Sequence, residues 1–241
     1  MKKLLSPTLS RWFCYALVLL CSATYAQPCT FNDVIERTIY SSYKKYNADL
    51  DMLAVLNYKK TDFYGFIGVN RKRLRITFTS IKKSEENKDV YEVEGFSTVM
   101  NKNKRTFKGT FTLLSHYRLT EPAFDGDEPL KKGEAEGFST FSYTLKEDEN
   151  LTATGIFKGE MLVLWYKGIN KKPVYTELSI QSDGSINYQF FGTWTSYTTK
   201  KTSVASWGEY RIPCSGDFDG GDGTFYPTPK YWQYGWEEFR Y

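Results

Sequence analysis

Apolar and polar residues alternate along most of the chain, and this period of two is the feature that most constrains the fold. Leu74, Ile76 and Phe78 share one face of the segment 73–80, with basic residues and threonines between them, and the segment 106–113 repeats the pattern. Successive side chains of a β-strand point to opposite faces of a sheet. The alternation therefore predicts half-buried antiparallel strands.

Short spacing between the alternating segments predicts one β architecture. Turn residues, such as those in the segments 101–104 and 182–184, separate many of the segments. We expect a mainly β fold, an antiparallel meander of about ten strands forming a barrel or a strongly bent sandwich, with one N-terminal helix. The predicted strands are 52–58, 62–69, 73–80, 89–99, 106–113, 134–145, 151–158, 160–167, 174–181 and 186–198.

Glycines recur within these segments. The sequence Phe-x-Gly recurs, for example at 63–65, 107–109, 157–159 and 190–192, and Glu-Gly-Phe-Ser-Thr occurs at 94–98 and again at 136–140. A phenylalanine can cover the bare backbone of a glycine, and the glycine allows a sharp bend. We interpret the motif as a bending device, with a glycine-lined ligand face as the alternative. The small residues expected on inner faces, which could leave a cavity, are Gly95, Ser97, Gly109, Gly137, Ser139 and Gly159.

The N-terminus has the pattern of a secretory signal. Basic residues precede the apolar run 12–21, which is too short to span a bilayer, and Thr24 and Ala26 place small residues at a cleavage site. The pattern predicts a signal peptide at 1–26 and a protein exported to the periplasm or the exterior, with a retained or lipid anchor as the alternative. The remaining residues, 27–241, form a single β domain, with a helix at about 31–46 and an aromatic, Gly/Pro-rich segment at 205–241.

Removal of the signal changes the charge and the cysteine count. Three basic residues leave, so the formal net charge falls from +4 to +1. A nearly neutral chain argues against a nucleic-acid partner, and no membrane span is expected after cleavage. Cys29 and Cys214 remain, and in an exported chain they predict one disulfide, with a redox pair as the alternative.

Few residues suit catalysis. His116 is the one histidine, expected at the surface or at a strand end, and the chain has no HExxH, P-loop or GxSxG motif. The chain is therefore more typical of a binding protein than of an enzyme. Paired carboxylates could still hydrolyse glycosides without histidine. Glu92 and Glu94, however, alternate with apolar residues as on a solvated outer face.

An acidic loop offers a metal hypothesis. Asp217, Asp219 and Asp222 stand among glycines, and calcium prefers several carboxylates on a flexible turn. Calcium is thus a candidate cofactor. The alternative is an Asp/Gly turn whose side chains bind the local backbone.

Aromatic residues gather toward the C-terminus and offer a ligand-binding hypothesis. Tryptophan rings stack on sugars and anchor interfaces when exposed, and fill a core when buried. Trp194 also belongs to the tripeptide 192–194, which resembles the Gly-x-Trp motif of lipocalins and avidins, barrels that hold small ligands. That motif belongs to their first strand, whereas here it lies in what the alternation predicts to be the last. The predicted ligand-binding residues are Trp194, Trp207, Trp232 and Trp236.

These patterns together favour an exported, non-enzymatic binding protein. We expect a β-barrel that holds a small apolar or glycan ligand or docks on a protein partner. The first alternative is a structural or interaction protein without a pocket, whose contact patch is the aromatic C-terminal segment. The second is a carbohydrate-active enzyme with paired carboxylates.

Overall fold

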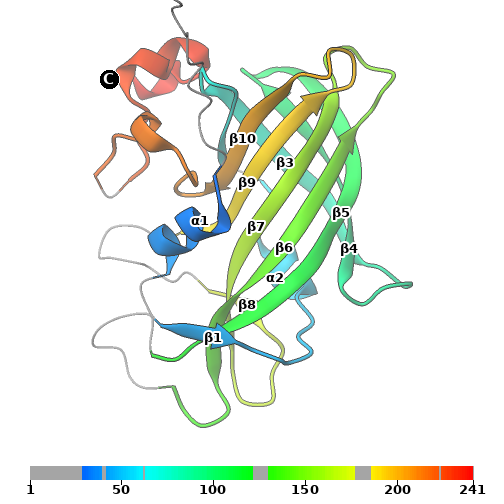
Figure 1. Cartoon of the computed structure of the whole chain (residues 1–241), viewed down its shortest axis with the longest axis vertical. Coiled ribbons are helices and arrows are strands. Elements are labelled where there is room, and N and C mark those ends of the chain that lie inside the picture. The colour runs from blue at the N-terminus through cyan, green and yellow to red at the C-terminus, as the bar shows by residue number, and fades with distance from the viewer. Residues whose placement is uncertain are drawn as a thin grey trace, which may run out of the picture.

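Ten antiparallel strands form a single sheet (Figure 1). The computed structural model describes residues 29–39, 42–61, 63–121, 130–176, 186–222 and 224–240, and the predicted signal peptide lies outside them. The strands are β1 (Tyr43–Lys45), β2 (Tyr64–Ile67), β3 (Lys72–Lys83), β4 (Val90–Val99), β5 (Lys102–Leu119), β6 (Ala135–Glu147), β7 (Gly155–Lys167), β8 (Val174–Tyr175), β9 (Asn187–Ser196) and β10 (Thr202–Glu209).

The sheet closes into a ring in chain order. Strands β2 to β7 pair consecutively, β9 pairs with β7, and β10 pairs with β9. The ring closes where β10 meets β2, with Ala205 opposite Ile67 and Trp207 opposite Gly65. The predicted mainly β fold, an antiparallel meander that bends round on itself, is confirmed.

The closed sheet is not a regular barrel. The register shifts between Phe78 and Ser80 in β3 and between Ser97 and Val99 in β4, and further shifts interrupt the pairings of β5 with β6 and of β9 with β10. Such β-bulges bend a strand and increase its twist. The short strands β1 and β8 extend the ring only where β5 and β7 end.

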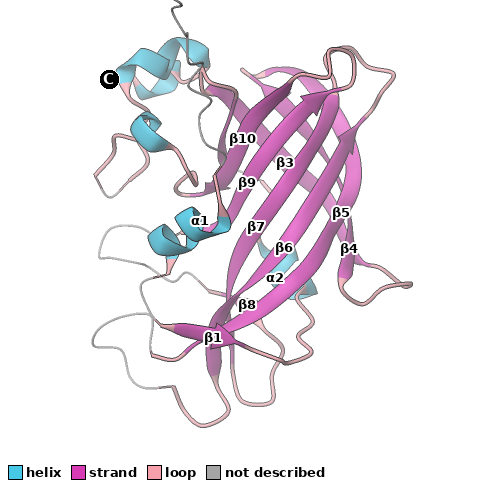
Figure 2. Cartoon of the chain, viewed as in Figure 1, coloured by secondary structure: helices cyan, strands magenta, loops and turns pink. Residues whose placement is uncertain are grey.

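The helices lie outside the ring or at its end (Figure 2). They are α1 (Phe31–Thr38), α2 (Leu53–Tyr58) and the 3-10 helices η1 (Gly216–Phe218), η2 (Pro229–Tyr234) and η3 (Glu237–Phe239). Thr30 and Asp33 cap α1 reciprocally through side chain and backbone. None of the helices in the described ranges is long and apolar enough to cross a membrane.

Two segments differ from their predicted structure at the N-terminal side. The predicted strand 52–58 is wrong, because residues 53–58 form the helix α2. Met52, which caps the helix, and Val55 and Leu56 within it are spaced as on one helical face and are almost completely buried. The predicted helix 31–46 ends at Thr38, and β1 follows because its backbone pairs with the end of β5.

Strand boundaries also differ in the second half of the chain. The second half of the segment 151–158 and the whole of 160–167 form one strand, β7, and residues 151–154 lie in the turn before it. The start of the segment 205–241, predicted as irregular, belongs to β10. The predicted strand 174–181 begins with β8, and residues 177–181 lie outside the described part of the chain.

Aromatic side chains fill the interior of the ring. Phe78 packs edge-on against Phe111, with ring centroids 5.5 Å apart. Phe190 stacks on Trp207 at 4.8 Å, and both are almost completely buried. At the end of the ring where β1 and β8 lie, α2 adds Val55 and Leu56 to the same core. The middle of the ring is therefore a packed core.

Cross-strand aromatic–glycine contacts make this packing feasible. Gly95 lies opposite Phe107 in the register, and a Cβ added at Gly95 would stand 2.7 Å from the Phe107 ring. Gly137 lies opposite Trp165 in the same way, with a distance of 2.7 Å. The ring that covers each of these two glycines comes from the neighbouring strand. The contact is thus a cross-strand pair of the kind that stabilises bent sheets.

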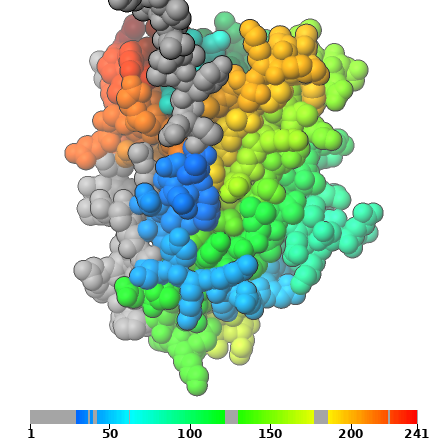
Figure 3. Space-filling model, viewed as in Figure 1, coloured from blue at the N-terminus to red at the C-terminus, as the bar shows by residue number. Residues whose placement is uncertain are grey.

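Two layers cover the outside of the ring. Helix α1 packs Ile35 against Phe138 and Leu164 on the outer face of β6 and β7. The C-terminal segment, residues 210–240, covers β2 and β10 and lies on the same side of the molecule as α1 (Figure 3). The predicted disulfide between Cys29 and Cys214 is confirmed, and it joins the start of α1 to this segment.

Buried contacts hold the C-terminal segment to the sheet. Trp236 is completely buried, packs in one cluster with Phe66, and donates a hydrogen bond from Nε1 to the carbonyl oxygen of Arg71 at 2.8 Å. Arg73 forms an ion pair with Glu238 at 2.6 Å. The basic cluster 71–73 therefore includes an anchor for the C-terminal segment.

The close approach at Gly95 gives a first testable prediction. A Cβ at this position would also stand 2.2 Å from the carbonyl oxygen of Thr77, so the strands would have to separate. We expect Gly95→Ala to lower the free energy of unfolding by about 1–3 kcal/mol in urea denaturation. Gly168→Ala is the control, because its Cβ would lie 3.3 Å from the flexible Lys171 chain and 3.7 Å from the Tyr166 hydroxyl, an ordinary contact distance. Equal stability of the two variants would contradict this packing.

Candidate functional site

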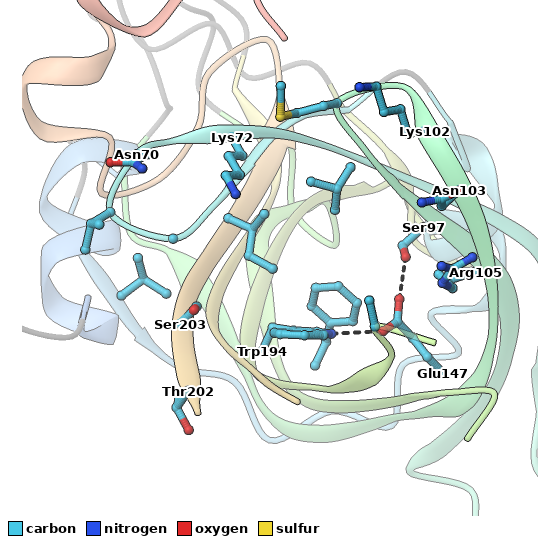
Figure 4. A pocket seen from close by; sticks show the side chains of 18 residues that line it. Asn70, Lys72, Ser97, Lys102, Asn103, Arg105, Glu147, Trp194, Thr202 and Ser203 are labelled. Carbon is cyan, nitrogen blue, oxygen red and sulfur yellow. Dashed lines mark hydrogen bonds between the residues drawn. The ribbon is translucent and has the colours of Figure 1, made fainter. Parts of the chain in front are cut away.

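A cavity of about 830 Å³ opens at one end of the closed sheet. It lies where the β2–β3, β4–β5 and β9–β10 turns meet the start of β7, opposite the end that α2 fills. Its wall is largely apolar, with side chains from all these elements (Figure 4). The apolar lining residues used below are Ile67, Val99, Met100, Phe157 and Val204.

The aromatic core ends at the cavity. Phe157 lines the cavity and packs edge-on against Trp207, with ring centroids 5.8 Å apart. Trp194 also lines the cavity and lies directly opposite Phe157 in the register of β7 and β9. The cavity is therefore the part of the ring interior that aromatic side chains leave unfilled.

Glu147 is a buried carboxylate in the cavity wall. It ends β6 and continues the inward alternation of Tyr143 and Leu145, so its side chain points into the ring. Its carboxylate accepts hydrogen bonds from the Ser97 hydroxyl, from Trp194 Nε1 at 2.9 Å and from the Gly155 backbone N–H at 2.9 Å. Three donors thus fix this carboxylate in place.

Burial raises the pKa of the Glu147 carboxyl above its ordinary value. Desolvation is the largest cause, because Glu147 is only 4% exposed. The hydrogen bonds from Ser97, Trp194 and Gly155 and the positive charge of Arg105 act in the opposite direction without cancelling it. The site therefore favours the protonated carboxyl more than water does.

Basic side chains surround the cavity mouth. Arg105 is placed in phase with the inward-facing Phe107 on β5 and lines the cavity, and the exposed Lys72 and Lys102 lie at its rim. The Arg105 Nε atom is buried without a hydrogen-bond partner. Among the described residues, no carboxylate forms an ion pair with any of these three side chains.

The predicted tryptophans do not form one site. Trp194 lines the cavity, whereas Trp207 lies in the core beneath it. Trp232 and Trp236 lie in the C-terminal segment, where Trp236 is completely buried and Trp232 donates a hydrogen bond to the Pro227 carbonyl oxygen. Of the predicted ligand-binding residues, Trp194 is the one that borders the cavity.

Two of the three carboxylates of the predicted calcium loop, those of Asp217 and Asp219, contact basic side chains and backbone groups. Asp217 pairs with Lys230, and Asp219 pairs with Arg211 at 2.7 Å and accepts the backbone N–H groups of Gly221 and Tyr226. Within the ranges that the structure describes, no three acidic, histidine or cysteine side chains gather as a metal site. This geometry matches the Asp/Gly turn, and we carry no calcium site into the proposed function.

His116 lies in the interior. It is 6% exposed, and its Nδ1 lies 2.7 Å from the Ser139 hydroxyl, which also accepts a hydrogen bond from Trp165 Nε1. The expectation of a surface position is therefore corrected, whereas His116 does lie near a strand end, three residues before the end of β5. Ser139 has no exposed surface, so this Ser–His contact offers no accessible nucleophile.

Sequence reasoning missed Glu147 and Arg105 as site residues. Both stand in phase with inward-facing residues of long strands, at the ends of β6 and β5. A charged residue that continues the apolar face of a strand is the signal that identifies them.

A comparison of the chain with protein-family models, curated proteins and solved structures found no match.

The raised pKa of Glu147 predicts a pH dependence. The folded state binds this proton more tightly than the unfolded state, whose carboxyl has the ordinary value of 4.5. The free energy of unfolding therefore falls as the pH rises from about 4.5 through the raised pKa. We expect the stability of the wild type relative to Glu147→Gln, measured by urea denaturation, to fall over this range.

Glu94→Gln is a control whose effect on stability should change with pH in the opposite direction. The hydrogen bond from Lys108 lowers the pKa of the exposed Glu94 carboxyl, so its contribution to stability is lost as the pH falls below 4.5. A Glu147 difference that grows with rising pH would mean that Arg105 and the hydrogen bonds outweigh burial.

Proposed function

We propose that this protein is a non-enzymatic binding protein that holds one small, largely apolar ligand in the end cavity. The observation that carries the proposal is the cavity of about 830 Å³ in a closed sheet whose middle is otherwise packed. Ligand pockets in proteins have volumes of roughly 300–1,000 Å³ and mostly apolar walls with a few placed polar groups. The cavity has this character.

The wall chemistry favours an apolar ligand over a glycan. Ile67, Val99, Met100, Phe157 and Val204 present aliphatic and aromatic surface to the cavity. The indole N–H of Trp194 is already bound to Glu147 and is not free for a sugar hydroxyl. Apolar contacts therefore make up most of what the cavity offers a ligand.

The alternatives receive less support. Glycoside hydrolysis needs two carboxylates, and Glu147 is the one carboxylate of the described residues that lines the cavity. In a protein that does not use a pocket we expect side chains to fill this space, because empty apolar cavities lower stability. The Cys29–Cys214 disulfide supports the proposal that the protein acts after export, in the periplasm or outside the cell.

A dye titration tests the proposal. Nile red is neutral and fluoresces in apolar surroundings, and we expect it to bind the purified protein saturably with one molecule per chain. Ser203 lines the cavity opposite Trp194, so Ser203→Trp fills the space and should abolish binding. Lys158→Trp places the same side chain at an exposed position on β7 and should bind like the wild type. Equal binding by both variants would place the dye elsewhere and overturn the proposal.

A further inference from the structure

Arg105 stands where a closed sheet usually buries an apolar residue. It is placed in phase with Phe107 and Phe111 on β5, lies opposite Ser97 in the register, and borders the cavity. Arg105 is partly exposed, but its Nε atom is buried, and a buried donor of a charged group without a partner is costly. The placement of this guanidinium therefore calls for a compensating group.

Within the described residues, the guanidinium of Arg105 has fewer hydrogen-bond partners than it has donors. Its Nη1 donates one long hydrogen bond, of 3.4 Å, to the carbonyl oxygen of Lys104, and its buried Nε has no hydrogen-bond partner. Glu147 lies close enough to interact electrostatically, but the two form no ion pair. Both Glu147 oxygens already accept hydrogen bonds from Ser97, Trp194 and Gly155.

The charged residues of the cavity lining are mostly basic. Lys72, Lys102 and Arg105 contribute three positive charges, and Glu147 contributes at most one negative charge. Figure 4 shows Lys72 and Arg105 approaching the cavity from different sides. A guanidinium offers a fork of donors that matches an acidic group, and an ammonium adds a point charge.

We propose that the ligand of this cavity is an amphiphile whose acidic group binds Arg105 and Lys72 while its apolar part lies against Ile67, Val99 and Phe157. The inference rests on the proposed function, because it assigns a ligand class to the same cavity. The acidic group accepts hydrogen bonds from the outer nitrogens of the Arg105 guanidinium, whose Nη1 makes only the long bond to Lys104. Carboxylate, sulfate and phosphate groups share this chemistry, and a carboxylate serves as the probe.

Competition against Nile red tests the head group. Dodecanoate and dodecanol have the same apolar chain and differ in the acidic group. We expect dodecanoate to displace the dye from the wild type at a concentration at least about tenfold lower than dodecanol, and added salt to narrow this difference. Arg105→Gln should weaken dodecanoate about tenfold and leave dodecanol unchanged.

Matched variants separate a local contact from net charge and from misfolding. Lys108→Gln removes one positive charge from an outer position on β5, where Lys108 pairs with Glu94, and should leave dodecanoate binding unchanged. Lys72→Gln changes an exposed residue at the rim and should weaken dodecanoate binding by a smaller factor than Arg105→Gln. Lys72→Gln therefore keeps the test decisive if Arg105→Gln does not fold.

The outcomes distinguish this inference from the proposed function. Equal displacement by dodecanoate and dodecanol, with no effect of Arg105→Gln or Lys72→Gln, would overturn the acidic ligand and leave the apolar cavity standing. Displacement by dodecanol but not by dodecanoate would do the same. Failure of Nile red itself to bind in a Ser203-dependent manner would overturn both.

Discussion

The rest of the structure depends on how aromatic rings pack against glycine backbone inside a closed sheet. Gly95 and Gly137 leave room for the rings of Phe107 and Trp165 on the neighbouring strands. A Cβ at either glycine would stand 2.7 Å from the ring, which is closer than side chains pack. Because these rings pack closely against the glycine backbone, large side chains fill the middle of the closed sheet. Packed interiors admit few voids. The cavity opens where this aromatic packing ends.

At the cavity the strands keep the same alternation of inward and outward residues, but several of their inward-facing residues are polar or charged. The strands run on past the aromatic core, and their inward positions change to Ser97, Arg105, Glu147 and Trp194. Hydrogen bonds from Ser97 and Trp194 hold Glu147, whereas Arg105 keeps an unused donor. The same alternation that builds the core thus also places the polar groups of the site.

The alternation predicted the fold class because its period depends only on local backbone geometry. The disulfide could also be predicted from the sequence, because only two cysteines follow the predicted signal. The helix α2 was missed because a short apolar run fits both periods, and β10 because Gly208 and the aromatic residues beyond it obscured the strand. The meeting of Glu147 with Ser97 and Trp194 depends on which strands the closure brings together, and distant contacts of this kind have no local signal.

Fluorine NMR of the protein labelled with 5-fluorotryptophan tests the central claim most directly, because tryptophans mark both the cavity and the C-terminal segment. Single Trp→Phe variants assign the resonances, and dodecanoate serves as the ligand. The account predicts that the resonance of Trp194 shifts in proportion to occupancy while those of Trp232 and Trp236 keep their positions. A shift at Trp232 or Trp236 with an unchanged Trp194 would contradict it and place the binding surface on the C-terminal segment.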